Sequence, residues 1–249
     1  MARAIPGVAA ARALVATGAL ILAPDAGAQS IEDARFAHEE GRFLEAADLG
    51  EALGTSDGYT LAAQSLALYA HYKATAEEWN EVVERAMRLG EAAVNADPTS
   101  PEAHCQFAHA IARYAQRSST MTALRKNLAG RIRDLLEAAL EIDPDHALTH
   151  LLLGIWHADV AAAGFLARTI YGADREDAID HYERAMELAP DSKIVMYEYA
   201  ISLPELDEDG GVEAAREMLE KALALPVRDA HEEWVHLDIL DGLDWLAGR

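Results

Sequence analysis

The sequence predicts an all-α fold, a right-handed solenoid of elongated helical hairpins with a capping helix at its C-terminal end. Three prolines, Pro98, Pro144 and Pro190, fall 46 residues apart, and each follows a similar alanine-rich helical pattern. A fixed period of this length is typical of stacked helical repeats, in which no unit buries its apolar face alone. Apolar residues make up 51% of the chain and aromatic residues only 6%, which suits close helix packing through small side chains. We therefore expect almost no β-structure.

Residues 1–28 form a separate segment. Two arginines precede the apolar run 13–23, and the small residues Ala26 and Ala28 fit a cleavage site before Gln29. This pattern predicts a secretory signal peptide, and hence an exported protein of the bacterial periplasm. A membrane anchor and an organellar transit peptide stay open as alternatives. However, the run is shorter than the roughly 20 residues that span a bilayer, so we expect no stable membrane insertion after cleavage.

The chain is strongly acidic, with 43 Asp and Glu against 21 Lys and Arg and a formal net charge of -22. Such a charge repels nucleic acid and anionic lipid headgroups, so we expect no nucleic-acid partner. Two explanations of the acidity stay open. The outer helix faces are simply solvated, or one acidic face attracts a basic partner.

Apolar residues at helical spacing, with proline or glycine at the turns, divide residues 29–249 into one repeat domain of five units and a cap. In the first unit, Gly41 marks the turn between two short helices, and the second unit ends before Pro98 because proline excludes helix at the residue before it. The last segment is amphipathic and forms the cap that an open solenoid end requires. The units are about 31–54, 59–97, 101–143, 147–190 and 193–226, and the cap is 229–247.

The fourth unit resembles the tetratricopeptide repeat (TPR). Leu153 and Gly154 form the Leu-Gly pair of its first helix. In its second helix, Ala178 is the small residue, Tyr182 the aromatic residue and Pro190 the closing proline. A standard repeat has about 34 residues, so each period carries a surplus. We expect the surplus to lengthen the helices.

A narrower resemblance covers about residues 95–205, which are similar to the regulator of microtubule dynamics family. It rests on the segments that begin at Pro101, Leu136 and Ala178. The resemblance implies a TPR-like helical protein. Eukaryotic relatives are associated with microtubules and with lipid transfer at organelle contacts, roles that do not carry over to an exported chain. The stretch 154–157 reads Gly-Ile-Trp-His, where those relatives usually have Gly-Arg-Trp-Cys.

Candidate catalytic and metal groups are few. His146, His150 and His157 share one helix face, so a zinc site and simple packing are both open. Packing is favoured because His150 and His157 occupy packing positions of the repeat. The acidic turn at 205–216 has the offsets of a calcium loop but ends in Arg216, where a bidentate carboxylate is required.

No phosphate-binding loop or nucleophile elbow is present, and Cys105 has no cysteine partner. We therefore predict a protein that is not an enzyme and that has no catalytic residues, no cofactor and no metal.

The concave face of the solenoid is the predicted binding surface, formed by residues one position beyond the packing positions of each first helix. The candidate ligand-binding residues are Leu148, Leu151, Ile155, Ile194, Tyr197, Ile201, Cys105 and His109. This face grades from apolar to polar, which suits a peptide or protein partner or, alternatively, a lipid-like amphipathic molecule. The competing hypothesis is that the protein fills this face itself. Either the C-terminal helix, with Trp234, Leu237, Leu240 and Trp245, or the stretch near Phe165 would occupy it.

Overall fold

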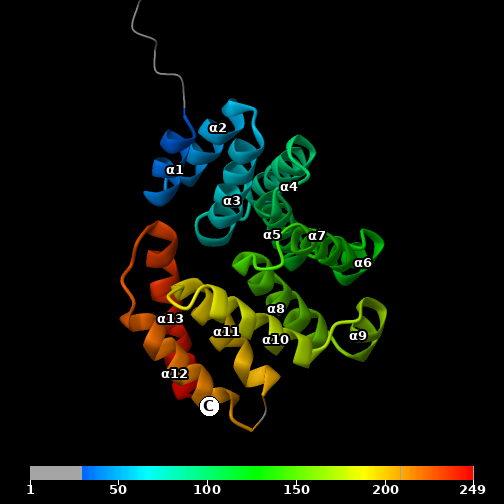
Figure 1. Ribbon diagram of the computed structural model, residues 1–249, viewed down its shortest axis with the longest axis vertical. Coiled ribbons are helices and arrows are strands. Elements are labelled where there is room, and N and C mark those ends of the chain that lie inside the picture. Colours follow the sequence, from blue (N-terminus) through cyan, green and yellow to red (C-terminus); the bar gives the residue numbers. More distant parts are fainter. Residues whose placement is uncertain (1–29, 208, 249) are drawn as a thin grey trace, which may run out of the picture.

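The computed structural model describes residues 30–207 and 209–248, which form helices and no strand. The all-α prediction is confirmed (Figure 1). The predicted signal peptide lies outside the described residues. Within these residues, no helix is long and apolar enough to cross a bilayer. The helices are α1 (Ile31–Glu39), α2 (Phe43–Leu53), α3 (Ser56–Tyr72), α4 (Trp79–Ala96), α5 (Pro101–Gln116), α6 (Thr120–Arg125), α7 (Leu128–Ile142), α8 (Ala147–Ala162), α9 (Phe165–Tyr171), α10 (Arg175–Leu188), α11 (Lys193–Leu206), α12 (Gly211–Ala224) and α13 (Ala230–Ala247).

The helices pack as successive hairpins: α1 with α2, α3 with α4, α5 with α7, α8 with α10, and α11 with α12. The first helices of neighbouring hairpins also contact each other, in the order α3, α5, α8, α11 and α13. No comparable set of contacts joins the second helices α4, α7, α10 and α12. The first helices therefore follow the inner, shorter path of the curve and form its concave face (Figure 1).

Local sequence sets the ends of these helices. Ser100 and Ser192 accept hydrogen bonds from the backbone N–H groups of Ala103 and Val195, and so cap α5 and α11. Asp97, which precedes Pro98, has extended backbone and ends α4. The predicted turns therefore follow from capping serines and prolines.

The surplus of the third and fourth units is placed differently from our expectation. It forms the short helices α6 and α9 between the two helices of a hairpin, so the prediction of longer helices is wrong for these units. Gly164 and Gly172 bracket α9 with φ of 106° and 71°, and Asn127, between α6 and α7, has φ of 48°. These left-handed conformations, which glycine and asparagine tolerate best, interrupt the helix.

The core is continuous because neighbouring hairpins share it. Leu148 packs against both the C-terminal and the central group of buried residues, and Tyr114 packs against both the central and the N-terminal group. Gly154 lets two helices approach closely, since a Cβ atom on it would lie 2.9 Å from the Tyr182 ring. The Leu-Gly pair of the repeat therefore has a direct packing reason.

The C-terminal helix returns to the N-terminal end of the solenoid, where α13 contacts α1. The Tyr72 hydroxyl of α3 donates a hydrogen bond of 2.9 Å to Asp238 of α13. The Tyr72 ring also stacks on Trp234, with 5.2 Å between ring centroids. The capping helix thus brings the two ends of the curve together across the concave face.

Candidate functional site

Most of the predicted apolar binding residues belong to the core. Leu151 is only 3% exposed and is part of the C-terminal core group. Leu148, Ile155 and Ile194 are half-buried and pack against that same group. Ile201 keeps 36% of its surface exposed. The concave face is therefore less apolar than its sequence pattern indicates.

Cys105 is fully buried and offers no surface to a ligand. Its Sγ lies 3.1 Å from Thr149 Oγ1. Burial raises the pKa of the thiol to about 12. The side chain therefore acts as a small buried group and not as a nucleophile.

The three histidines of the possible zinc site each have another partner. The Nδ1 atom of His146 lies 2.8 Å from Thr149 Oγ1. His150 Nδ1 lies 3.0 Å from His181 Nδ1, and His157 accepts a hydrogen bond from the Asp174 backbone N–H. Among residues 30–207 and 209–248, no group of three or more His, Cys, Asp or Glu side chains is arranged to hold a metal ion.

The protein fills only part of its own concave face. Trp234 lies against Tyr72, as described above. However, Leu237 and Leu240 are 48% and 42% exposed, and Phe165 is 83% exposed. These three side chains point to solvent and fill no interior space.

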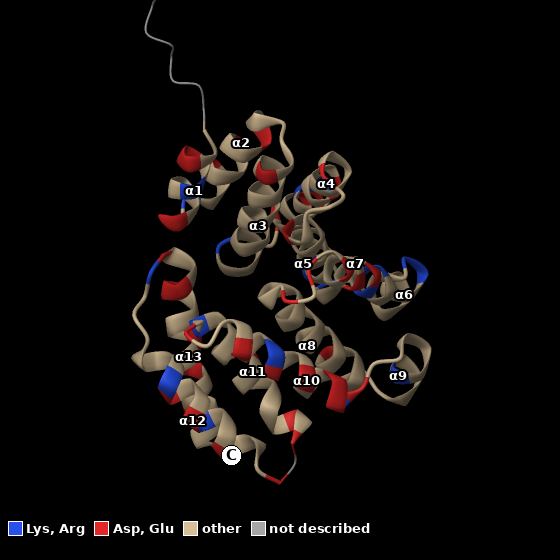
Figure 2. Cartoon of the chain, viewed as in Figure 1, with Lys and Arg blue, Asp and Glu red and all other residues tan. Residues whose placement is uncertain are grey.

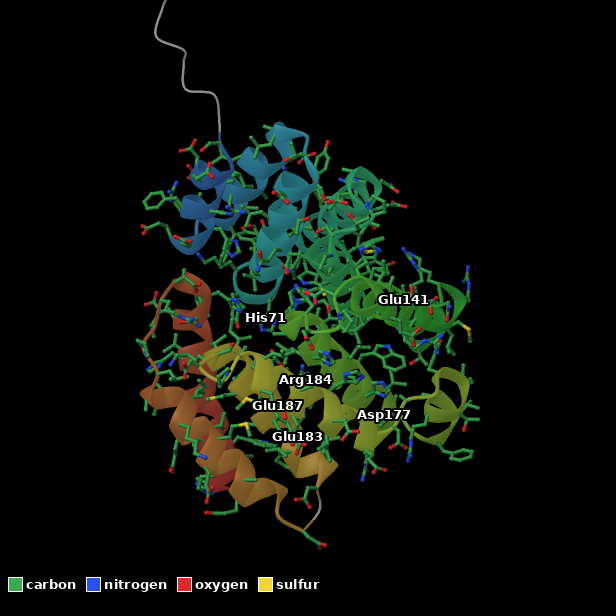
Figure 3. All side chains as sticks on the ribbon, viewed as in Figure 1. His71, Glu141, Asp177, Glu183, Arg184 and Glu187 are labelled. Carbon is green, nitrogen blue, oxygen red and sulfur yellow. The ribbon has the colours of Figure 1, made fainter. Side chains whose placement is uncertain are left out.

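A polar cluster centred on Arg113 occupies the middle of the concave face. The Arg113 Nε donates to His109 Nε2 at 3.2 Å, and its Nη1 donates to His71 Nδ1 at 3.0 Å and to Gln116 Oε1 at 3.2 Å. His71 lies at the C-terminal end of α3, on the side of α8 and α11, in Figure 3. We call Arg113, His71, His109, Tyr72, Glu198 and Asp238 the Arg113 cluster. They come from α3, α5, α11 and α13.

The direct hydrogen-bond partners of the Arg113 guanidinium are neutral groups. The pKa of His71 is lowered to about 4, mainly by burial and also by the charge of Arg113. Burial and the charge of Arg113 also hold the pKa of His109 well below its ordinary value. Both imidazoles are therefore uncharged at neutral pH and act as acceptors. No described carboxylate lies close enough to Arg113 to form an ion pair with it.

Carboxylates form the other half of the cluster. The pKa of Glu198 is raised to about 7, mainly by burial; Arg113 opposes the shift, and the charges of Asp159 and Asp238 contribute to it. Glu198 keeps some exposure to solvent, although protein surrounds it closely. Burial also raises the pKa of Asp238. A carboxyl that titrates near neutrality beside an arginine is typical of a binding site.

One of the predicted residues belongs to the Arg113 cluster and a second lies beside it. His109 is part of the cluster, and Tyr197 lies beside it, since Asp238 and Glu198 both help raise the pKa of Tyr197. Leu151 and Cys105 lie in the core. The structure thus joins one residue from the polar end of the predicted face with one from its apolar end.

Arg113 is not among the residues predicted for the concave face, although the sequence contains a signal for it. Arg113, Asp159 and Glu205 fall 46 residues apart, the same period as the closing prolines. They occupy matching positions near the ends of α5, α8 and α11, one helical turn beyond the positions chosen for the predicted face. Glu205 raises the pKa of Asp159, which places these two side chains near each other.

Comparison with known proteins identifies the family. Residues 56–246 match the family model of regulator of microtubule dynamics protein 1-3. The chain belongs to this family. The match includes every member of the Arg113 cluster, from His71 to Asp238. No curated protein matches the chain in sequence.

Solved structures agree with the fold of the chain. A thermophilic TPR protein of Thermus thermophilus has a TM-score of 0.60 at 17% identity, and the match covers 84% of this chain and 96% of that one. YrrB, a TPR protein with an unusual peptide-binding site, has a TM-score of 0.42 at 13% identity, over 86% and 90% of the two chains. A monomeric IFIT1 mutant has a TM-score of 0.45 at 15% identity, over 85% and 58%. The first of these shows a TPR-like fold.

Proposed function

We propose that this protein is an exported, non-catalytic scaffold that binds a peptide segment of a partner protein along its concave face. The Arg113 cluster is the observation that carries the proposal. It gathers polar and titratable groups from four helices at a place where a solenoid needs only packing. Gathering charged and titratable groups in a partly desolvated place costs free energy, which favours a binding role over a purely structural one.

The chemistry of the cluster matches a peptide. Arg113 has neutral neighbours within hydrogen-bonding distance, so its charge is available to a carboxylate of the ligand. Glu198 and Asp238 supply acceptors for backbone N–H groups or for a basic side chain. A peptide segment offers both kinds of group within a few residues.

A carrier of lipid-like molecules is the alternative function. It requires an apolar concave face, whereas Leu148, Ile155 and Ile194 pack against the core. The polar centre of the face therefore favours a peptide. Native mass spectrometry with organic extraction distinguishes the two, because a carrier retains a lipid-sized adduct and a peptide-binding scaffold does not.

A catalytic role has little support from the cluster or its surroundings. The Ser65 hydroxyl lies 2.8 Å from His38 Nδ1, but it is fully buried and donates its proton to the Leu61 carbonyl. Such a hydroxyl joins α1 to α3 and has no access to a substrate.

The proposal that the protein is exported rests on the sequence pattern of residues 1–28. The mass of the protein recovered from its own cells tests cleavage before Gln29.

Photo-cross-linking in cells tests the binding proposal. A photoreactive residue replaces Tyr197 on the concave face or, as a control, Glu84 on the outer helix α4. We expect protein adducts from position 197 alone, and we expect Arg113→Gln to reduce them ~10-fold or more. Arg88→Gln, which removes an exposed arginine from α4, should leave them unchanged. Adducts from position 84 alone, or adducts that Arg113→Gln leaves undiminished in a folded protein, contradict the proposal.

A further inference from the structure

The two inserted helices, α6 and α9, carry the three most exposed large apolar side chains in the described part of the chain, and two further exposed ones. Phe165, Leu166 and Met121 are 83%, 71% and 65% exposed, and Ile170 and Leu124 are 55% and 50% exposed. Neither helix contains a buried residue. Water solvates large apolar groups poorly, so a concentration of them on two short helices indicates a contact surface.

Both helices are held against the same part of the core. Ala123 of α6 and Ala167 and Tyr171 of α9 pack against the central core group. The backbone carbonyl of Tyr171 also accepts a hydrogen bond of 2.9 Å from Arg133 Nη1 of α7. The helices therefore project on the same flank of the molecule while their apolar side chains stay outside (Figure 1).

The charge of this flank is opposite to that of the whole chain. Residues 114–132 contain four Lys and Arg and no Asp or Glu, and residues 160–173 contain one Arg and no Asp or Glu. In the same chain, 43 acidic residues outnumber 21 basic ones. In Figure 2 the end of α6 is basic, whereas many of the other helices carry acidic segments.

Several of these basic side chains have no carboxylate partner among the described residues. Arg117 lies over the Trp79 ring, and Arg131 lies over the Phe107 ring. Lys126 lies over the Tyr114 ring and donates a hydrogen bond to the Tyr114 hydroxyl. Arg125 is exposed at the end of α6. In contrast, Arg168 of α9 pairs with Asp174 at 3.0 Å and adds little net charge. The positive charge of the flank is therefore concentrated at α6.

We propose that α6 and α9 form a docking surface for an anionic membrane. We call Met121, Leu124, Arg125, Lys126, Phe165, Leu166 and Ile170 the insertion flank. Exposed apolar side chains next to unpaired basic ones are the combination that binds the interface of an anionic bilayer, where apolar groups enter the acyl region and cations meet the phosphates. The net charge of the chain does not prevent this contact, because charges beyond about 8 Å are screened at physiological salt.

A membrane fits the shape of this surface better than a protein partner does. The apolar groups lie on two separate, projecting helices, and the hollow beside α9, of about 360 Å³, is lined by Phe165, Arg168 and Thr169 and is shallow. A protein partner would need a complementary groove for each helix, whereas a fluid bilayer adapts to both. The proposal is independent of the concave face, since no member of the insertion flank belongs to the Arg113 cluster.

Sedimentation with vesicles tests the proposal. The full chain is mixed with vesicles of phosphatidylcholine and phosphatidylglycerol, or of phosphatidylcholine alone. We expect binding to the anionic vesicles only, reduced ~30-fold or more by Arg125→Glu with Lys126→Glu and at least ~10-fold by Phe165→Ser with Leu166→Ser. Binding to neither kind of vesicle overturns the proposal.

Matched control variants separate the flank from general effects of charge and apolarity. Arg88→Glu with Lys221→Glu makes the same change in net charge on α4 and α12. Leu237→Ser with Leu240→Ser removes two exposed leucines from α13. Both controls should bind anionic vesicles like the original protein. Equal losses in the flank variants and the controls also overturn the proposal, as does vesicle binding that depends on neither.

A fluorescent label at the flank gives a second readout that does not depend on affinity. Leu166→Cys can be labelled alone, because Cys105 is buried and its thiol pKa is raised to about 12. An environment-sensitive dye at position 166 should shift to shorter wavelength with phosphatidylglycerol vesicles. The same dye on Leu237→Cys should not shift. A shift at position 237 alone places the membrane contact elsewhere and contradicts the proposal.

Discussion

The Arg113 cluster and the insertion flank both carry positive charge in an acidic protein, but their surroundings differ. Arg113 lies among neutral histidines, with Glu198 and Asp238 beyond them, where burial changes the pKa of nearly every group. Arg125 and Lys126 lie in solvent next to exposed apolar side chains. The first site is built by the repeat register and the second by insertions between paired helices. One solenoid can therefore acquire two separate binding surfaces.

The largest expected effect concerns the concave face. Arg113→Gln should weaken binding of the cross-linked peptide by ~10- to 100-fold, because it removes a charge-assisted hydrogen bond in a desolvated place. Fluorescence anisotropy measures the affinity. Arg113→Lys, which keeps the charge, should retain part of it, and binding to anionic vesicles should not change. A parallel loss of peptide and vesicle binding would mean that the two surfaces are not separate.

The insertion flank should respond to salt more strongly than the concave face. Vesicle binding depends on exposed charges, which salt screens, and raising the ionic strength from about 0.05 M to about 0.5 M should reduce it ~10-fold or more. Peptide binding at the desolvated Arg113 should fall much less. Sedimentation and anisotropy across a salt series measure both. An equal salt dependence would remove the distinction between the sites.

Glu198 should make the stability of the fold depend on pH. Its folded-state pKa is raised to about 7, so its contribution is most favourable below the ordinary carboxyl pKa and is lost as pH rises through about 7. Glu198→Gln should therefore stabilise the protein by about 1 to 2 kcal/mol at about pH 8, and by less at about pH 5. Urea unfolding at the two pH values measures the difference, and the exposed Glu220→Gln serves as control. A gain that is the same at both pH values contradicts the assignment.

The histidines act in the opposite direction, which sharpens the test. The pKa of His71 is depressed to about 4, so its contribution is present above its ordinary pKa and is lost as pH falls through about 4. His71→Gln should therefore reduce the acid sensitivity of the protein between about pH 6.5 and pH 4. Thermal unfolding at several pH values shows the change. No substitution in the insertion flank should alter either pH dependence.

The smallest effect concerns the closure of the curve. Tyr72→Phe removes the donor to Asp238 and should cost about 1 kcal/mol of unfolding free energy. Phe165→Ser with Leu166→Ser should change stability by less than about 0.5 kcal/mol, since both side chains are exposed. Urea unfolding compares the two. A larger loss from the flank variant would mean that α9 is packed in solution.

The architecture was predictable because it depends on a period. The prolines at 98, 144 and 190 end helices through a local backbone restriction, and the Leu-Gly pair allows close packing at Tyr182. The short helices α6 and α9 were not predicted, since the pattern of apolar residues continues through them. Only the left-handed conformations at Asn127, Gly164 and Gly172 interrupt it.

The candidate site was harder to predict than the fold. The expected face followed the apolar positions of α8 and α11, but Leu151 and its neighbours were needed to fill the space between hairpins. The Arg113 cluster depends on α13 returning to α3, a contact between Tyr72 and Asp238 that joins residues 166 positions apart. The 46-residue period places Arg113, Asp159 and Glu205 at equivalent positions of successive repeats. The approach of Asp238 to them depends on the curvature of all the stacked hairpins together.

Hydrogen exchange tests most directly the claim that the two surfaces are separate. The protein is compared alone, with phosphatidylglycerol vesicles, and with the peptide recovered by cross-linking. We predict that vesicles protect α6 and α9, and that the peptide protects the inner helices α3, α5 and α11 while α6 and α9 exchange as before. Protection of the same helices by both ligands, or protection of α6 and α9 by neither, would contradict the account.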